Sequence, residues 1–412
     1  MSHPADVRIV QRCRSCGAAD LHLVLSLGET PLANDLPAAD DPRPPERYPL
    51  DLLLCADCGL AQLRQAVSPR RLFSDYLYFS SFSDTMLWHA ETTADALVRE
   101  RRLGPASLVV EIASNDGYLL QFVRRRGVPV LGVEPAANVA RVAEEKGIPT
   151  VVEFFGRALA ERLAAEGKLA DAIVGNNVLA HVPEPNDFVA GVATLLRQDG
   201  VARFEVPYVE EMLERLEFDT IYHEHQCYFS LTALVGLFGR HGLRVVDVER
   251  LPIHGGSIRV SVGHGGEPGR RVERMLEEEA RRGVRSLDRY RAFADAVEGL
   301  RSRLVALLGS LKAEGASVAA YGAAAKGVTL TSYCGVDERI LDFVVDRSTY
   351  KQGRLFPVGR LPILAPSALI ERRPDYALLL TWNFADEILA QQARYREAGG
   401  RFLIPVPRPR VV

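Results

Sequence analysis

Two C-x-x-C pairs near the N-terminus constrain the fold of this chain more than any other feature: Cys13 with Cys16, and Cys55 with Cys58. A two-residue gap lets both thiolates of a pair point at one tetrahedral ion, and the glycine that follows each pair permits the necessary turn. Two such pairs provide the four soft ligands of a closed structural Zn²⁺ site, with no position left open for a substrate. The 38 residues between the pairs predict a small β-rich lobe that carries this site.

A redox pair and a disulfide framework are the other interpretations of these cysteines. A redox pair needs a βαβ pattern beside one C-x-x-C, and disulfides need an oxidising compartment; the sequence indicates neither. The first ten residues, MSHPADVRIV, lack the apolar core of a signal peptide, and no apolar run reaches the length of a membrane span. We therefore expect a cytoplasmic protein.

The composition is typical of a folded protein with several domains. The 412 residues are 47% hydrophobic and 25% charged, which is ample for large cores. A formal net charge of −3 gives no reason to expect nucleic acid or an anionic membrane as a partner. The sequence does not set the oligomeric state, and a monomer is compatible with it.

The chain divides into three predicted regions, at residues 1–75, 76–300 and 301–412. Short apolar runs predict strands at 50–54, 107–112, 128–133, 150–155, 170–174, 201–206, 317–321, 341–345 and 376–380. Helical patterns lie at 137–146 and 156–166, and a polar helical connector at 272–303. This βαβ rhythm predicts an α/β protein in which a parallel, doubly wound sheet is followed by a second, shorter α/β unit.

The first α/β unit opens with a strand that ends in a small-residue turn, VVEIASNDGYLL at 109–120. Such a turn lets backbone N–H groups approach a ligand at a helix N-terminus. About twenty residues later the next strand ends in Glu134, where a carboxylate suits the two ribose hydroxyls of an adenosine. These features predict an adenosine ligand, although Ala113 and Asn115 stand where the dinucleotide motif needs glycine. The alternative is a charged strand end with a helix N-cap at Asn115 or Asp116.

A dense cluster of groups that can transfer protons lies in the segment DTIYHEHQCYFS. Three interpretations stay open: a polar buried connector, an H-x-H metal pair, and a general acid/base constellation with histidine as the base. If the segment is extended, His223 and His225 share one face and Tyr222 and Glu224 the other. His181, in NNVLAHVP after the fourth strand, is a further candidate.

These motifs resemble those of the sugar C-methyltransferases that act on dTDP-linked 4-keto deoxysugars in antibiotic biosynthesis. The resemblance spans nearly the whole chain, in CRSCG, LGETPLAN, YPLDLLLCADCGLAQL, EIASNDGYLLQ, NNVLAHV, EVPYV, IYHEH, HGGSIRV and AAYGAAAKG. It implies a zinc-binding N-terminal lobe, a central Rossmann-like domain for S-adenosylmethionine (SAM) and a C-terminal Rossmann-like α/β domain. Ala113 departs from the family pattern, which has glycine at this position.

The resemblance also implies a catalytic role for Tyr222, Glu224 and His225, aided by Tyr76. We predict that His225 removes the C-3 proton of a dTDP-4-keto deoxysugar, with Glu224 orienting it or carrying protons. Tyr222 or Tyr76 would donate a hydrogen bond to the C-4 oxygen while the enolate forms. His181 is the reserve candidate for the base.

Two further sets of residues complete the predicted site. The cofactor set follows the turn and its neighbouring strands: Glu111, Ala113, Asn115, Gly117, Glu134, Pro135, Phe154, Phe155 and Asn176. The substrate set is Asn177, Gly322, Lys326 and Lys351. Gly322 and Lys326 belong to a C-terminal turn that we expect to receive the pyrophosphate of the dTDP-sugar.

The sequence leaves two rival functions. One is an NAD-dependent nucleotide-sugar oxidoreductase, although AAYGAAAKG lacks the glycine triplet that this function needs. The other is a non-enzymatic, zinc-containing nucleotide-binding module.

Overall fold

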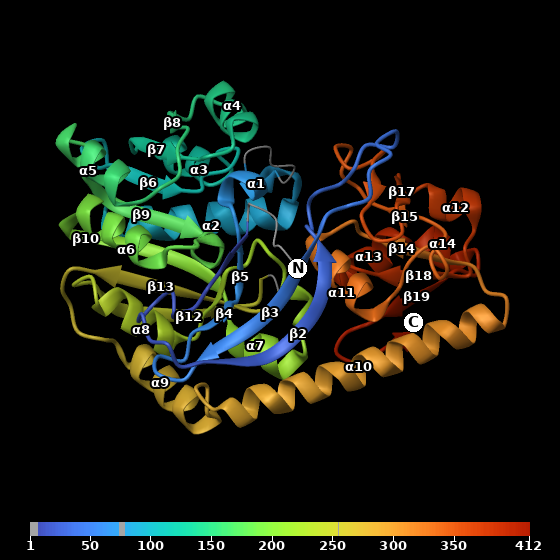
Figure 1. The fold of residues 1–412 in the computed structure, drawn as a ribbon. Helices are drawn as coiled ribbons and strands as arrows, with labels where there is room; N and C mark the ends of the chain where they lie inside the picture. The colour runs from blue at the N-terminus through green and yellow to red at the C-terminus, as the bar shows by residue number, and fades with distance from the viewer. Residues whose placement is uncertain (1–6, 74–78, 254) are drawn as a thin grey trace.

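The computed structural model describes residues 7–73, 79–253 and 255–412, so Tyr76 lies outside the described residues. The strands form four sheets: a two-stranded ribbon and a four-stranded sheet in the N-terminal lobe, and two seven-stranded sheets in the rest of the chain. Figure 1 shows the lobe, in blue, between the two larger α/β parts. This architecture confirms the predicted fold class.

The strands of the N-terminal lobe pair in antiparallel fashion: β1 Val7–Ile9, β2 Leu21–Pro31, β3 Arg47–Cys55, β4 Ala61–Leu63 and β5 Gln65–Val67. The strand predicted at 50–54 lies inside β3, where Leu50, Leu52 and Leu54 are fully buried. The four-stranded sheet has the order β11-β4-β3-β2, and β11 Cys227–Tyr228 comes from the middle of the chain. A strand from outside residues 1–75 therefore completes the sheet of the lobe.

The central sheet contains five parallel strands, as the βαβ rhythm predicts: β6 Val109–Ile112, β7 Val130–Val133, β8 Thr150–Val151, β9 Ala170–Asn176 and β10 Leu196–Pro207. The full order is β12-β13-β10-β9-β6-β7-β8. The strand β13 Ser257–Gly263 runs antiparallel to both β10 and β12 Arg244–Leu251, a reversed edge that the sequence analysis did not include. The helices of this part are α2 Asp84–Arg101, α3 Leu120–Arg125, α4 Ala137–Glu145, α5 Arg157–Ala165, α6 Pro185–Leu195, α7 Val209–Arg215, α8 Leu231–Gly239 and α9 Arg270–Arg282.

The strand predicted at 150–155 ends early, at Val151. Since β8 is an edge strand that pairs only with β7, its ladder is short and one side of the backbone is free to leave the sheet. The chain then turns, which leaves Phe154 44% exposed and packs Phe155 against Phe188 with ring centroids 5.3 Å apart. The turn brings Phe154 and Phe155 to the cavity described below.

The C-terminal part is a second parallel sheet with an antiparallel strand at each edge, in the order β16-β17-β15-β14-β18-β19-β20. Its strands are β14 Val318–Tyr321, β15 Val344–Val345, β16 Leu355–Phe356, β17 Leu361–Leu364, β18 Tyr376–Leu379, β19 Arg401–Ile404 and β20 Arg410–Val411. Its helices are α11 Ala325–Cys334, α12 Ala368–Arg372, α13 Ala385–Gln391 and α14 Ala393–Glu397. The strands predicted in this region correspond to β14, β15 and β18, and β15 is shorter than expected.

Helix α10 Leu287–Ala313 joins the three parts through one shared core, and Figure 1 shows it running along the molecule into the C-terminal part. The core contains Leu300 of this helix together with Leu52 of β3 and Val318 of β14. The apolar residues of α10 recur every three or four positions, as in any amphipathic helix, and are buried: Tyr290, Phe293, Val297, Leu300, Leu304, Leu308 and Leu311. The helix runs through position 300, where the sequence analysis places a domain boundary. The predicted domain boundaries stay predictions.

No helix among the described residues has the length and apolar character that a membrane crossing needs.

Candidate functional site

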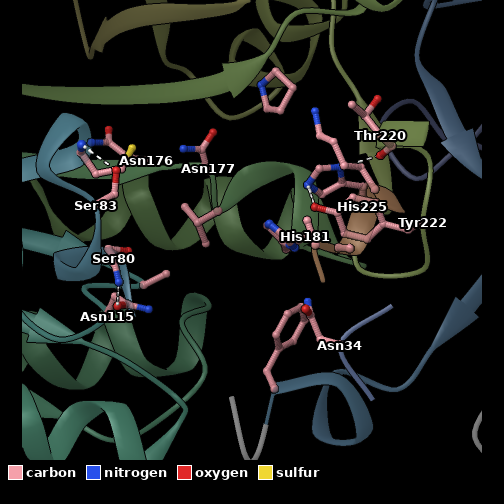
Figure 2. Close-up of a pocket in the computed structure, with 18 of the residues that line it drawn as sticks. Asn34, Ser80, Ser83, Asn115, Asn176, Asn177, His181, Thr220, Tyr222 and His225 are labelled. Atoms are coloured by element: carbon pink, nitrogen blue, oxygen red, sulfur yellow. Dashed lines mark hydrogen bonds between the residues drawn. The ribbon is translucent and has the colours of Figure 1, made fainter. Parts of the chain in front are cut away.

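A cavity of about 960 Å³ is lined by residues from all three parts of the chain. Residues that follow β6, β7 and β9 line it, and so do residues that follow β14, β15 and β18. The carboxyl ends of parallel strands are where α/β sheets bind their ligands, and here two sheets offer these ends to one space. The N-terminal lobe contributes Asn34 and the short helix α1 Pro69–Phe73. Figure 2 shows Asn115, Asn176 and Asn177 in one part of the cavity and His181, Tyr222 and His225 in another.

The turn after β6 has an unusual backbone. Ala113, Asn115 and Gly117 have φ angles of 57°, 50° and 75°, in the left-handed region that glycine adopts without strain. The helix α3 begins only at Leu120, and Leu119 precedes it as the N-cap residue, so the alternative of an N-cap at Asn115 or Asp116 is wrong. The side-chain oxygen of Asn115 instead accepts a hydrogen bond from the backbone N–H of Ser80 at 2.8 Å.

Glu134 closes this turn from the end of β7. Its carboxylate accepts backbone N–H bonds from Asn115 at 3.0 Å and from Ala136 at 2.9 Å, which fixes its orientation. Burial raises the pKa of Glu134 to about 7. Each oxygen keeps a second lone pair, and the side chain lines the cavity, so the carboxylate fits a pair of ribose hydroxyls.

Glu111 lies within β6 and is fully buried. Neither of its carboxylate oxygens has a hydrogen-bond partner among the described residues. Burial, and then the neighbouring carboxylates of Asp116 and Glu134, raise the pKa of Glu111 well above its usual value. Glu111 and Gly117 are not among the described residues that line the cavity, whereas the other predicted cofactor residues are: Ala113, Asn115, Glu134, Pro135, Phe154, Phe155 and Asn176.

The segment with the histidines forms a turn, so the arrangement described for an extended segment does not apply. The backbone N–H of His225 donates to the carbonyl of Tyr222 at 2.9 Å, which brings residues three apart to the same side. His223 points elsewhere: it is buried, and its Nε2 contacts the carbonyl oxygen of Pro49 at 3.1 Å. Because the two histidines face different neighbours, the H-x-H metal interpretation is not supported.

Tyr222 and His225 form a hydrogen-bonded pair that lines the cavity (Figure 2). The Nδ1 atom of His225 lies 2.9 Å from the carbonyl oxygen of Thr220, and since a carbonyl only accepts, Nδ1 carries the proton. The Nε2 atom is therefore the basic nitrogen, and it accepts a hydrogen bond from the Tyr222 hydroxyl at 2.9 Å. This tautomer is the one that a general base needs.

His181 lies beside this pair, on the short helix η2 Leu179–His181, and its ring centroid is 4.8 Å from that of His225. Burial lowers the pKa of His181 to about 4, so the ring is neutral near neutral pH. Glu224 is buried and accepts a hydrogen bond from the Asn34 side-chain amide at 2.6 Å. The structure thus places His181, Tyr222 and His225 at the cavity and adds Asn34, which stands in the LGETPLAN motif.

The four predicted substrate residues also line the cavity: Asn177, Gly322, Lys326 and Lys351. Gly322 has φ of 97°, and a Cβ there would lie 2.6 Å from the Thr381 side chain, so this turn needs glycine. The ammonium of Lys351 donates to the carbonyl of Ala323 at 2.8 Å. The ammonium of Lys326 lies 4.5 Å from the ring centroid of Trp382.

The surroundings of Lys326 are acidic. Trp382 donates a hydrogen bond to Asp219 at 2.6 Å. Burial raises the pKa of Asp219 and raises that of Glu217 to about 8, and the positive charge of Lys326 opposes part of each rise. Lys326 is thus already close to buried carboxyl groups, a feature that the sequence did not reveal.

The two α/β units share one detail at the end of their second strand. Asp346 follows β15 and accepts backbone N–H bonds from Ala323, in the turn after β14, and from Ser348. Glu134 accepts the equivalent pair of bonds after β7. In each unit, an acidic side chain connects the cavity-facing turn to the end of the neighbouring strand.

The four cysteine sulfurs of the N-terminal lobe lie within 4.8 Å of one another. The closest contacts join Cys13 to Cys58 at 3.5 Å and Cys16 to Cys55 at 3.6 Å, and all six cysteines are free of disulfides. A tetrahedral ion with Zn–S bonds of about 2.3 Å separates its sulfurs by roughly 3.8 Å, so the cluster fits Zn²⁺. The site is closed, since four thiolates occupy all four positions.

Comparisons with known proteins agree with this geometry. Family models match residues 13–73 (a domain described as zinc binding), 88–248 (methyltransferase domain) and 252–407 (C-methyltransferase C-terminal domain). The C-methyltransferase NovU of Streptomyces niveus is 40% identical over 412 residues, which cover 98% of this chain and 98% of that protein. This chain belongs to the C-methyltransferase family. It is a SAM-dependent methyltransferase with a cysteine-bearing N-terminal domain.

More distant similarities concern parts of this C-methyltransferase. A ubiquinone biosynthesis O-methyltransferase of Bartonella quintana is 30% identical over 152 residues, 34% of this chain and 61% of that protein. The crystal structure of the PH0226 protein of Pyrococcus horikoshii covers 47% of this chain and 97% of its own, with a TM-score of 0.37 and 16% identity.

The cysteine cluster predicts one Zn²⁺ per chain. Metal analysis of the purified C-methyltransferase should find this stoichiometry, and Cys16→Ser should abolish it and lower the melting temperature, because the metal contributes folding free energy to the lobe. Cys334→Ser is the matched control, since Cys334 is buried outside the cluster. Wild-type protein without zinc, or a Cys16→Ser variant that retains it, would contradict the assignment.

The left-handed backbone of Ala113 predicts that Ala113→Gly stabilises the protein. An alanine in this conformation costs about 1–2 kcal/mol, and the entropy of glycine in the unfolded chain offsets part of the relief, so the free energy of unfolding should rise by about 1 kcal/mol. Denaturant unfolding monitored by circular dichroism measures it. Ala106→Gly is the control, because Ala106 lies in an exposed turn without positive φ and glycine there should destabilise. Equal destabilisation by both changes would refute the argument.

Proposed function

We propose that this C-methyltransferase transfers the methyl group of SAM to C-3 of a dTDP-linked 4-keto deoxysugar through an enolate. The observation that carries the proposal is the Tyr222–His225 pair, which shares one cavity with the turn after β6 and with Glu134. A proton beside a ketone is removed at a useful rate only when a base and a hydrogen-bond donor act on the same centre. The pair offers a base, Nε2 of His225, and a donor, the Tyr222 hydroxyl, and these two atoms lie 2.9 Å apart.

In this proposal His225 is the general base. Its Nε2 takes the C-3 proton while Nδ1 keeps its bond to the Thr220 carbonyl, which also stabilises the imidazolium that forms. The hydroxyl of Tyr222, which donates to Nε2 in the structure, would turn to the C-4 oxygen and stabilise the enolate. Neutral His181 lies beside them as the reserve base, and Tyr76 stays an expected donor.

SAM, when bound, supplies an electrophilic methyl group on a sulfonium. We assign the turn from Ala113 to Asn115 and Glu134 to the adenosine, with Phe154 and Phe155 near the adenine. Support comes from the orientation of the Glu134 carboxylate and from the exposure of Phe154 at the cavity wall.

We assign the dTDP group to the C-terminal turn that leads into α11. Its support is the place of Gly322, Lys326 and Lys351 along the same cavity. A pyrophosphate there would meet the N-terminal end of α11. It would draw Lys351 from the Ala323 carbonyl and would provide an acceptor for the buried ammonium of Lys326. Binding energy at the nucleotide would then hold the sugar at Tyr222 and His225.

The direct test incubates the enzyme with a panel of dTDP-4-keto deoxysugars and SAM that carries a ¹³C-labelled methyl group. Mass spectrometry should show a gain of one labelled methyl in place of a hydrogen, and the ¹³C chemical shift should be that of a methyl on carbon. The same incubation with NAD instead of SAM should leave the sugars unchanged. A methyl on oxygen, or unmodified sugars throughout the panel, would contradict the proposal.

A further inference from the structure

The N-terminal lobe makes several contacts with the turn that carries Tyr222 and His225. Directly after the turn, β11 pairs with β4 in the register Cys227 to Gln62 and Tyr228 to Ala61. The backbone N–H of Leu63 donates to the carbonyl of Gln226 at 3.0 Å. The sheet of the cysteine lobe therefore includes the residues that follow the proposed base.

Arg14 lies between the first two cysteines, in the segment 12–17 that we call the metal knuckle, and its side chain extends from there into this region. Its side chain is nearly buried, with 7% exposed, although burying a guanidinium costs free energy unless its donors are satisfied. One terminal nitrogen donates to the carbonyl of Pro183 at 3.0 Å, and the other donates to the Gln226 side-chain oxygen at 2.9 Å. Pro183 stands two residues after His181, and Gln226 stands directly after His225.

Gln226 in turn forms hydrogen bonds with the segments that carry His181 and His225. Its backbone N–H donates to the carbonyl of Ala180 at 2.7 Å, and its side-chain amide donates to the carbonyl of His223 at 2.5 Å. Through Gln226 and Pro183, the fork of Arg14 holds the segment before and after His181 and the turn before His225. The buried guanidinium of Arg14 thus contacts both segments that carry these two histidines.

We propose that Arg14 is a positioning residue for the base, so that the metal knuckle orients the reaction centre as well as stabilising the lobe. The role in catalysis rests on the function proposed above. A planar guanidinium suits this role because its acceptors, Pro183, Gln226 and Leu63, belong to different segments, and a lysine presents a single ammonium. A displacement of the base by about 1 Å costs on the order of 10²-fold in rate.

The experiment compares Arg14→Lys with Arg12→Lys. Arg12 lies on the same knuckle but is exposed, and its side chain contacts only the Gly17 carbonyl among the hydrogen bonds of the described residues. In Arg14→Lys, kcat should fall about 10- to 100-fold, with zinc content, SAM affinity by calorimetry and KM unchanged. The ¹⁵N resonances of the His181 and His225 rings should shift in Arg14→Lys alone.

Wild-type kcat in Arg14→Lys, or a loss of kcat that follows a loss of zinc or of SAM affinity, would overturn the positioning role. If Arg14→Lys does not fold, Gln226→Met removes the hydrogen bond between Arg14 and Gln226 from the other side. It should likewise lower kcat and leave KM unchanged. If the wild-type enzyme shows no turnover, the proposed function fails, but the histidine resonances still decide whether Arg14 positions these rings.

Discussion

The pairing of β11 with β4 is the interaction on which the rest of the site depends. The turn at residues 221–226 contacts the helix η2 through Gln226 and Ala180, and the cysteine lobe through Gln62 and Leu63. Thr329 of α11 also donates a hydrogen bond to the carbonyl of Ile221. A short turn has few interactions of its own, so its geometry must come from what surrounds it. The lobe that carries the cysteines therefore forms part of the wall of the proposed active site, and in this account its fold positions His225.

The shared core along α10 explains how the carboxyl ends of two parallel sheets come to face one cavity. Apolar residues of α10 pack with β3 of the lobe and with β14 of the C-terminal sheet in a single cluster. Such a core makes the angle between the units a property of close packing, which resists deformation. The carboxyl ends of both parallel sheets then face one cavity, and the carboxylates of Glu134 and Asp346 fasten the turn in each unit.

The sequence predicted those features that residue type and spacing encode locally. The cysteine cluster, the parallel strands and the small-residue turn before Glu134 belong to this class. The catalytic role of the histidine segment stays a prediction. The contacts of Thr220 with His225 and of Arg14 with Pro183 use backbone carbonyls, which every residue has, so no pattern announces them. The reversed edge of β12 and β13 and the turn at Tyr222 depend on packing between distant segments, which periodicity does not reveal.

Exchange of the substrate's C-3 proton with solvent tests the central claim most directly, because it isolates the action of His225 from methyl transfer. The enzyme without SAM is placed in D₂O with the dTDP-4-keto sugar that it methylates, and ¹H NMR follows the C-3 signal. The account predicts loss of this signal with wild-type enzyme and a rate about 10²–10⁴-fold lower in His225→Asn. Exchange at the wild-type rate in His225→Asn would contradict the account and place the base elsewhere.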